Sequence, residues 1–284
     1  MSAVLRCALS FDVEEHFHVA NLAHRFPRAQ WDRVPSRLDV GMDALLGALE
    51  RSGARATFFF LGWVGERRPD LVRRCLEAGH EIASHGWEHR FLADLGPEGL
   101  DADLARTEEA LVAAGAPKPR GFRASTFTLT RETFWALDVL VRRGYRYDSS
   151  IHPVHHPTYG IPDFEPGISR VRAPGGAGEL VEFPVSTFPL GGRNLPVGGG
   201  GYFRLLPGAV HRAALRGLLR RGREVALYMH PWEFDPGQPR VPAPFLKRFR
   251  HYLNLERSLP RLERLLGEFR FGTMEGVLGE AGWV

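Results

Sequence analysis

The chain has 284 residues, of which 44% are hydrophobic and 25% charged, and its net charge is only +4. A single (β/α) barrel often takes about 250 residues, so no second domain is required. No uninterrupted apolar run approaches the roughly 18 residues of a membrane span, and the two cysteines, Cys7 and Cys75, are too few for a disulfide framework. No export segment precedes Leu5, and the two cysteines are expected to be buried thiols, so a cytoplasmic protein is the simplest interpretation. We expect no nucleic-acid partner.

Apolar runs typical of strands alternate along the chain with segments typical of helices. Strands are predicted near residues 5–11, 56–60, 81–83, 121–123, 146–148, 181–183 and 225–229. Helices are predicted near residues 42–51, 69–78, 99–114, 132–143 and 207–221. Gly53, Gly79, Gly115 and Gly144 follow the first four of these helices, as helix-ending glycines do. The alternation predicts an α/β fold.

Two irregular regions, residues 151–178 and 191–202, interrupt this alternation. The first contains His152, His155 and His156, but the prolines at positions 153 and 157 favour an ordered loop over a second metal site. The second contains the glycine run 198–201, which lacks the Lys-Ser/Thr of a phosphate loop. We expect this run to let the backbone approach a sugar or another chain segment closely.

A pair of carboxylates follows the first predicted strand, in the sequence Asp12-Val13-Glu14. Because successive residues of a strand point to opposite faces, Asp12 and Glu14 are expected to point the same way. One carboxylate could then hold a metal ion while the other moves a proton. Taken alone, the pair fits a solvated loop equally well, since carboxylates usually face water.

His85 and His89 follow the predicted strand at residues 81–83. Their i,i+4 spacing would place both imidazoles on one helical face, within reach of one divalent ion. Imidazole and carboxylate ligands with an open position suit Zn²⁺, which is the metal we expect. Histidines at this spacing are often a surface coincidence, and it is the carboxylates at the neighbouring strand end that make the spacing specific.

Two further strand ends carry Arg123 and His230. If these strands share one parallel sheet, all of their carboxyl ends meet at one edge of it. Arg123 would then lie beside Asp12, where a guanidinium group orients a carboxylate. His230 is followed by Pro231 and Trp232, and the alternative to a catalytic role is a structural histidine held against Trp232.

These segments, in this order, resemble the motifs of the polysaccharide deacetylases, the family 4 carbohydrate esterases related to the chitooligosaccharide deacetylase of nodulation. The resemblance rests on Phe11-Asp12-Val13-Glu14, His85-Gly86-Trp87-Glu88-His89, Phe122-Arg123-Ala124-Ser125 and Leu227-Tyr228-Met229-His230. It implies a distorted (β/α) barrel with about seven parallel strands and an active site at their C-terminal ends. It also implies metal-dependent removal of acetyl groups from N-acetylated sugars.

Three departures from the family pattern bear on the site. Asp12-Val13-Glu14 replaces two adjacent aspartates, so the resemblance implies Glu14 as the metal carboxylate. Ser125 and Thr126 replace the commoner Pro and Tyr, although a backbone N–H here can still stabilise an oxyanion. Asp148 is the carboxylate expected to orient His230, without the Trp that the family usually has nearby.

Segments of the second half, among them Glu182-Phe183-Pro184 and His230-Pro231-Trp232-Glu233, resemble the deacetylases found with exosortase systems and exopolysaccharide loci. We interpret residues 1–284 as one catalytic domain with a family-specific part from about residue 180. The resemblance implies an N-acetylated glycan of a nascent surface polysaccharide as the substrate. It further implies peripheral association with the exopolysaccharide machinery at the inner face of the membrane, and it leaves the oligomeric state open.

The expected mechanism assigns the metal to Glu14, His85 and His89. Asp12 is the base that takes a proton from the attacking water, and His230 protonates the departing amine. Arg123 and Asp148 complete the catalytic set.

Three aromatic residues, Trp87, Tyr202 and Trp232, are candidate sugar platforms, although large aromatic side chains more often belong to a core. Two other functions stay open. One is an amidohydrolase that acts on a small cyclic amide or ureide. The other is a non-catalytic carbohydrate-binding relative, which the full set of carboxylates and histidines disfavours.

Overall fold

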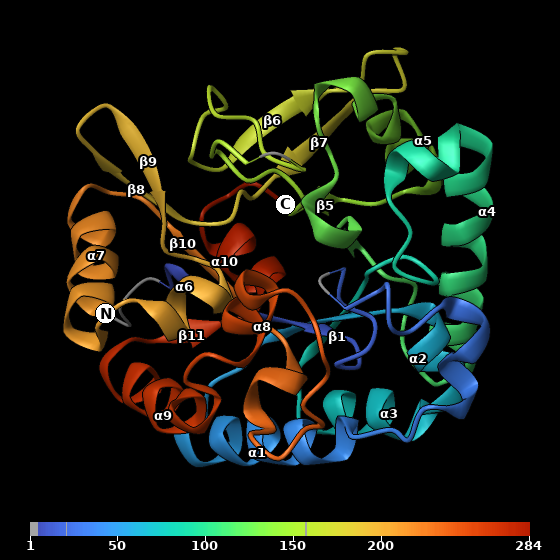
Figure 1. Cartoon of the computed structure of the whole chain (residues 1–284). Helices are drawn as coiled ribbons and strands as arrows, with labels where there is room; N and C mark the ends of the chain where they lie inside the picture. The colour runs from blue at the N-terminus through green and yellow to red at the C-terminus, as the bar shows by residue number, and fades with distance from the viewer. Residues whose placement is uncertain (1–4, 21, 157) are drawn as a thin grey trace.

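A curled, mostly parallel β-sheet forms the centre of the molecule (Figure 1). The computed structural model describes residues 5–20, 22–156 and 158–284. Seven parallel strands follow one another in the order β10-β1-β2-β3-β4-β5-β7. Their bounds are β1 (Cys7–Val13), β2 (Thr57–Phe60), β3 (Glu81–Ser84), β4 (Gly121–Phe122), β5 (Tyr147–Asp148), β7 (Glu179–Glu182) and β10 (Val225–Met229). The predicted α/β barrel with about seven parallel strands is confirmed.

Two further strands and one contact between the sides of the sheet complete the barrel. β6 (Ser169–Arg172) pairs antiparallel with β7, and β11 (Phe271–Gly272) pairs in parallel with the start of β1. Just beyond β7, the Ser186 N–H donates to the Ala226 carbonyl of β10 (3.1 Å) and the Ser186 hydroxyl accepts from the Ala226 N–H (2.8 Å). The sheet therefore curls until its two sides meet, which gives a distorted barrel.

The first strand shows how the sheet divides its side chains. β1 is buried along its whole length. Leu9, Phe11 and Val13 belong to a core shared with the outer helices, whereas Ala8 belongs to a second core together with Met274 and other residues of the barrel interior. Because successive strand residues point to opposite faces, Ser10 and Asp12 share the inward side with Ala8. The polar groups of the site therefore begin where the apolar interior ends.

The helices lie mostly on the outer side of the sheet, except the last one, which packs against the interior of the barrel (Figure 1). They are α1 (Leu38–Ser52), α2 (Gly62–Arg67), α3 (Pro69–Glu77), α4 (Leu92–Ala113), α5 (Trp135–Arg143), α6 (Gly200–Leu205), α7 (Gly208–Arg220), α8 (Phe245–Tyr252), α9 (Ser258–Glu268) and α10 (Met274–Glu280). The four predicted helix-ending glycines all have φ between 69° and 104°, the left-handed region that favours glycine. None of the helices in the described ranges is both long and apolar enough to cross a membrane.

The two regions predicted to be irregular contain strands. β6 lies in the first, and β9 (Arg193–Pro196) in the second, where it forms a hairpin with β8 (Thr187–Leu190). The turn is Gly191-Gly192 with φ values of 58° and 75°, and two successive positive φ angles fit a tight hairpin turn. β6 was not predicted because its sequence is mostly polar, with Arg170 and Arg172 exposed, and shows no clear apolar–polar alternation. Position 157, one of the two prolines of the first region, lies outside the described residues.

Candidate metal centre and active site

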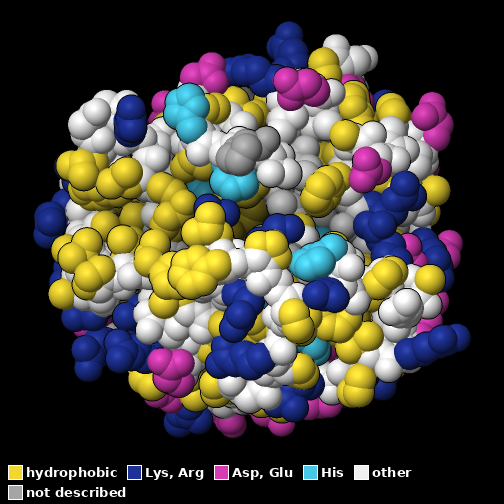
Figure 2. Space-filling model, in the orientation of Figure 1, with side chains coloured by type: hydrophobic (Ala, Val, Ile, Leu, Met, Phe, Trp, Pro, Cys, Tyr) yellow, Lys and Arg dark blue, Asp and Glu magenta, His cyan; other side chains and the backbone are white. Residues whose placement is uncertain are grey.

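The predicted catalytic and metal-binding residues all lie at the carboxyl ends of strands. Asp12 and Glu14 stand at the end of β1, His85 and His89 follow β3, Arg123 follows β4, Asp148 ends β5, and His230 follows β10. These strands are parallel, so their ends share one edge of the barrel, which we call the mouth. Figure 2 shows a hollow near the centre of the molecular face, bordered by histidine, Lys or Arg, and hydrophobic side chains.

Glu14, His85 and His89 form a candidate metal centre. Each offers a ligand atom, and these atoms lie within 4.8 Å of one another. All three side chains are buried, with exposures of 1%, 2% and 8%. Glu14 Oε2 lies 3.0 Å from His89 Nε2, yet it accepts no aligned hydrogen bond from any described residue. A buried carboxylate oxygen without a donor needs a cation, and a metal ion between these atoms would supply it.

The two histidines converge through a loop, which corrects the expected helical arrangement. Residues 85–89 are not helical. Gly86 (φ 72°) and His89 (φ 55°) both adopt left-handed backbone conformations, and these bring the His89 ring back toward His85, with 5.5 Å between the ring centroids. The i,i+4 spacing therefore reflects two sharp backbone bends after β3 and not one turn of an α-helix.

His85 is oriented and kept neutral for a ligand role. Its Nδ1–H donates to the Arg123 carbonyl oxygen at 2.7 Å, so Nε2 is the nitrogen left for a metal. A second hydrogen bond of this kind typically fixes the tautomer of a metal-binding histidine. Burial lowers the pKa of His85 to about 4, which keeps the imidazole uncharged near neutral pH.

Glu14 is held as a charged group. Burial raises its pKa, but the charge and contact of His89, with smaller effects of His230 and His85, outweigh burial and leave the pKa well below its usual range. The Trp232 indole N–H donates to the other carboxylate oxygen, Oε1, at 3.3 Å. One oxygen is thus positioned by Trp232 while Oε2 faces the two histidines.

Asp12 is paired with a fully buried arginine. Arg123 Nη1 donates to Asp12 Oδ1 at 2.6 Å and to the Ser10 hydroxyl at 2.9 Å. The other guanidinium nitrogens donate to the Ser149 carbonyl (3.1 Å) and hydroxyl (3.0 Å), and the Phe59 ring lies under the guanidinium. Arg123 therefore holds one oxygen of Asp12 in place and balances its charge, as its place in the sequence predicts.

His230 is oriented by Glu233, a residue that sequence reasoning did not assign to the site. The ring Nδ1–H donates to Glu233 Oε1 at 2.8 Å, and Nε2 points toward Asp12 Oδ2 (3.9 Å) and Glu14 Oε1 (3.5 Å). Burial lowers the pKa of His230, but the Glu233 hydrogen bond and the charges of Glu14, Glu233 and Asp12 outweigh it and raise the pKa above its usual value. The sequence spacing could have indicated this contact, because Glu233 stands three residues after His230, the spacing of a capping box.

Asp148 does not have the place that we expected for it beside His230. Its carboxylate accepts from the Ser150 hydroxyl (2.5 Å) and from the Ser150 N–H (3.1 Å). The same hydroxyl accepts from the Ala124 N–H at 2.7 Å, so Asp148 holds together the loops after β4 and β5. Burial raises the pKa of Asp148, in keeping with an enclosed structural position. The expected orientation of His230 by Asp148 is therefore wrong, because Glu233 occupies Nδ1.

The three aromatic candidates differ in accessibility. Trp87 is 4% exposed and carries the Arg106 guanidinium over its ring. Trp232 is 9% exposed, and its ring stacks on His230 at 5.0 Å and on His251 at 4.4 Å. Neither indole offers an open face, which argues against the expected platform role of both. Tyr202 is half-buried and lines a cavity near the mouth.

The glycine run 198–201 packs against the site. A Cβ atom at Gly200 would overlap the Glu233 carboxylate, and one at Gly199 would lie 2.9 Å from the Tyr228 ring. The run therefore brings the start of α6 against β10 and Glu233, the close approach between chain segments that we expected. Among the described residues, His152, His155 and His156 do not form a metal-ligating group, and Glu14, His85 and His89 are the only such group found.

The fold and the site define a (β/α)-barrel protein with a candidate metal centre at its mouth and with Asp12 and His230 beside that centre. Residues 30–147 match the family described as polysaccharide deacetylase, and residues 149–279 match a domain of unknown function, DUF3473. The chain thus carries a polysaccharide deacetylase domain followed by a DUF3473 domain, and its resemblance to this family is confirmed over residues 30–147, which contain the segments His85–His89 and Phe122–Ser125. One sheet joins the two segments, since β5 of the first pairs with β7 of the second.

Two curated relatives match part of the chain. It is 32% identical over 111 residues to the chitooligosaccharide deacetylase of Rhizobium leguminosarum bv. trifolii, which covers 39% of this chain and 47% of that protein. It is 36% identical over 67 residues to the peptidoglycan-N-acetylglucosamine deacetylase PgdA of Listeria monocytogenes, which covers 24% of this chain and 14% of that protein. The chain spans less than half the length of each relative.

The whole chain has a counterpart among solved structures. A protein from Mycobacterium smegmatis, provisionally assigned as a polysaccharide deacetylase, shares the fold with a TM-score of 0.64 and 20% identity. The match covers 98% of this chain and 91% of that one. At this identity the likeness establishes the fold alone.

Proposed function

We propose that this chain is a metal-dependent deacetylase that removes acetyl groups from N-acetylated sugar residues of a surface polysaccharide. The polysaccharide deacetylase domain supports the reaction class, and the two relatives are named for deacetylation of peptidoglycan and of chitooligosaccharides. The observation that carries the proposal is the buried cluster of Glu14, His85 and His89 with Asp12 and His230 beside it.

The donor set at the mouth fits a divalent metal. Two imidazoles and one carboxylate that leave a position open are a ligand set typical of catalytic Zn²⁺. The neutral His85 and the donor-free Oε2 of Glu14 are in the protonation and hydrogen-bonding states that such ligands need. When bound, the ion would act as a Lewis acid toward the acetyl carbonyl group.

Asp12 is the proposed general base. Its Oδ1 is engaged by Arg123, so Oδ2 is the oxygen that remains to take a proton from the attacking water. Arg123 acts through Asp12 and is a positioning residue, because it is fully buried and has no access to substrate. A backbone N–H of the segment after β4, at Ser125 or Thr126, is the proposed donor to the oxyanion.

His230 is the proposed general acid. Because Glu233 engages Nδ1, the proton on Nε2 faces the site shared by Asp12 and Glu14. The raised pKa of His230 favours the protonated ring. From Nε2 the proton would pass to the departing amine when the C–N bond breaks.

Acetate release from N-acetylated oligosaccharides tests this function. Fully N-acetylated chitotetraose is incubated with the protein as purified, after chelation, and after addition of Zn²⁺ to the chelated protein. We expect acetate release to stop on chelation and to return with the metal. Release that continues in protein shown by mass spectrometry to be free of metal would contradict the metal-dependent reaction.

The two alternatives give different results in the same assays. Ring opening of a ureide such as hydantoin without acetate release would select the cyclic amidohydrolase. Glycan binding without any acetate release would select the non-catalytic relative. The particular polymer, the association with exopolysaccharide machinery and the cytoplasmic or membrane-proximal location stay predictions.

A further inference from the structure

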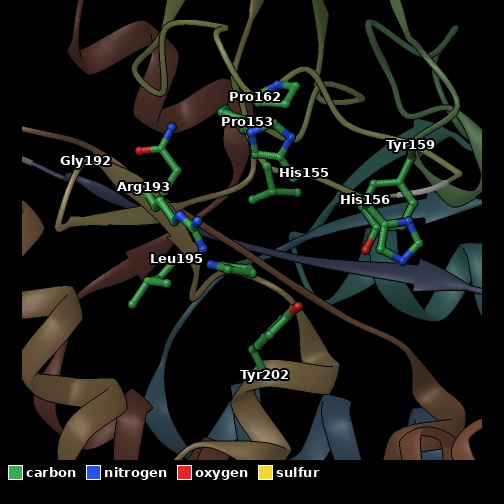
Figure 3. Close-up of a pocket in the computed structure, with 12 residues that line it drawn as sticks. Pro153, His155, His156, Tyr159, Pro162, Gly192, Arg193, Leu195 and Tyr202 are labelled. Atoms are coloured by element: carbon green, nitrogen blue, oxygen red, sulfur yellow. The ribbon is translucent and has the colours of Figure 1, made fainter.

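A cavity of about 540 Å³ lies near the mouth, between two segments of the DUF3473 domain (Figure 3). His155, His156 and Tyr159 line it from the loop after β5, and Arg193 and Leu195 line it from β9. Tyr202 rises from α6 with its hydroxyl toward the cavity. The mechanism proposed above uses none of these side chains.

A row of aromatic rings joins this cavity to the acid–base pair. The Tyr159 ring lies 6.1 Å from Phe127, Phe127 lies 4.6 Å from Tyr228, and Tyr228 lies 5.6 Å from His230, measured between ring centroids. Three successive ring contacts therefore separate the cavity wall from the proposed general acid. A glycan with one sugar unit at the metal centre would bring a nearby unit of the same chain to the cavity.

The charge at the described wall of the cavity comes from Arg193. None of its described lining residues is an Asp or a Glu. Arg193 is exposed on one wall, and the charge of Arg250, from α8, adds to the effect of burial in lowering the pKa of His156. Within the described part of the chain, neither arginine forms an ion pair.

The acidic side chains of the loop after β5 do not offset this charge. Asp163 pairs with Arg131 at 2.6 Å, and Glu165 pairs with Arg223 at 3.5 Å. On the face shown in Figure 2, Asp and Glu side chains lie toward the edge, whereas Lys or Arg side chains border the central hollow. An anionic ligand in the cavity would therefore meet unpaired cations and no nearby free carboxylate.

We infer that this cavity is a subsite for a sugar unit that carries an anionic group, a carboxylate or a phosphate. Arg193 supplies the cationic donor at the cavity wall, since a guanidinium group binds either anion through paired N–H bonds, and the charge of Arg250 adds to the attraction. The stacked His156 and Tyr159 rings, 3.8 Å apart, and the Tyr202 hydroxyl supply flat and polar surface for the sugar ring. Resting on the proposed function, the inference specifies an acidic polysaccharide in which N-acetylated units stand near anionic units.

Direct binding tests the subsite independently of deacetylation. The probes are tetragalacturonate for the carboxylate, glucose 6-phosphate for the phosphate, and tetraglucose (maltotetraose) as the neutral reference. None of them has an acetamide group, so failure of the proposed reaction leaves this test intact. We expect one anionic probe to bind more tightly than the neutral reference and to lose affinity as salt is raised. Whichever anionic probe binds more tightly identifies the anionic group.

Two variants complete the test. In Arg193→Gln/Arg250→Gln we expect affinity for the anionic probe to fall by roughly tenfold or more, the usual worth of a charged hydrogen bond. Arg73→Gln, on the exposed surface of α3, is the matched control for loss of positive charge and should have little effect. The inference is overturned if neither anionic probe binds better than the neutral one, or if the control weakens binding as much as the double variant does.

Discussion

His230 and Glu233 are joined by two hydrogen bonds to one oxygen. The His230 backbone N–H donates to Glu233 Oε1 at 3.0 Å, and the ring Nδ1–H donates to the same atom at 2.8 Å. The second carboxylate oxygen accepts from Arg204 Nε at 2.5 Å, and both Glu233 and Arg204 are buried. The ring of His230 is thus fixed in orientation and tautomer, with Nε2 toward the site.

Glu233→Gln should lower the pKa of His230. Glu233 raises that pKa through its hydrogen bond and its charge, so an amide of the same shape removes most of the effect. If protonated His230 is the acid, the alkaline limb of the kcat/KM profile should move to lower pH. The measurement is acetate release from about pH 5 to above about pH 8, which includes the range in which histidine titrates, with Glu256→Gln on the exposed surface as control. An alkaline limb that stays in place would assign it to another group.

His230→Ala should distinguish acid catalysis from simple positioning. A proton matters most when the leaving amine is poor, so hydrolysis of N-acetyl sugars should slow far more than hydrolysis of an activated aryl acetate. The alkaline limb should also shift or vanish. Equal losses on both substrates, with an unchanged pH profile, would show that His230 only shapes the site.

The double variant His85→Ala/His89→Ala should lose the bound metal. Without the two imidazoles, Glu14 is the one ligand left in the cluster, and one ligand is too few to hold an ion tightly. Metal content is measured by mass spectrometry on protein purified in parallel with His24→Ala/His155→Ala, which removes two exposed histidines. Equal metal in the two double variants would refute the assignment of the site.

Asp12→Asn should separate catalysis from metal binding. Because Asp12 is proposed as the base and not as a metal ligand, the variant should keep the bound ion. Acetate release should fall by roughly 10²–10⁴-fold, the usual contribution of a general base. Activity and metal content are measured on the same preparation. Near-normal turnover with metal retained would exclude Asp12 as the base.

Asp103 should make the stability of the fold depend on pH. The Asp103 carboxylate accepts a hydrogen bond from the backbone N–H of Trp87 at 2.7 Å, and burial raises the pKa of Asp103 to about 6. In the unfolded chain the pKa of Asp103 is near 4, below its value in the folded protein, so proton binding favours the folded state. This stabilisation is complete below about pH 4 and is lost as pH rises through about 6. At about 1.4 kcal/mol per pKa unit, the loss is at most about 3 kcal/mol.

Asp103→Asn tests this dependence, since the amide can still accept the Trp87 N–H but does not titrate. The free energy of unfolding, measured in urea between about pH 4 and 7, should fall with rising pH less steeply in the variant than in the wild type. Parallel curves for the two proteins would show that Asp103 titrates at its ordinary pKa.

The sequence by itself determined the alternation of strands and helices and the placing of polar residues after the strands. It also determined that Asp12 and Glu14 share a face, because a strand alternates with a period of two wherever it lies. The parallel order of β10, β1, β3 and β4 then brings Asp12, Glu14, Arg123 and His230 to one mouth. Local periodicity is enough for the shared face of Asp12 and Glu14, whereas the common mouth also needs the parallel pairing of distant strands, which the alternation of strands and helices led us to expect.

Tertiary structure decided the partners of these residues. His85 and His89 converge through two left-handed residues that no helical period describes. Glu233 rather than Asp148 orients His230, because the turn after β10 and the Arg204 side chain bring its carboxylate to Nδ1. The cavity between the loop after β5 and the β8–β9 hairpin also exists only in the folded chain. Such contacts depend on backbone bends and on packing between distant segments, which a single sequence does not encode in its local pattern.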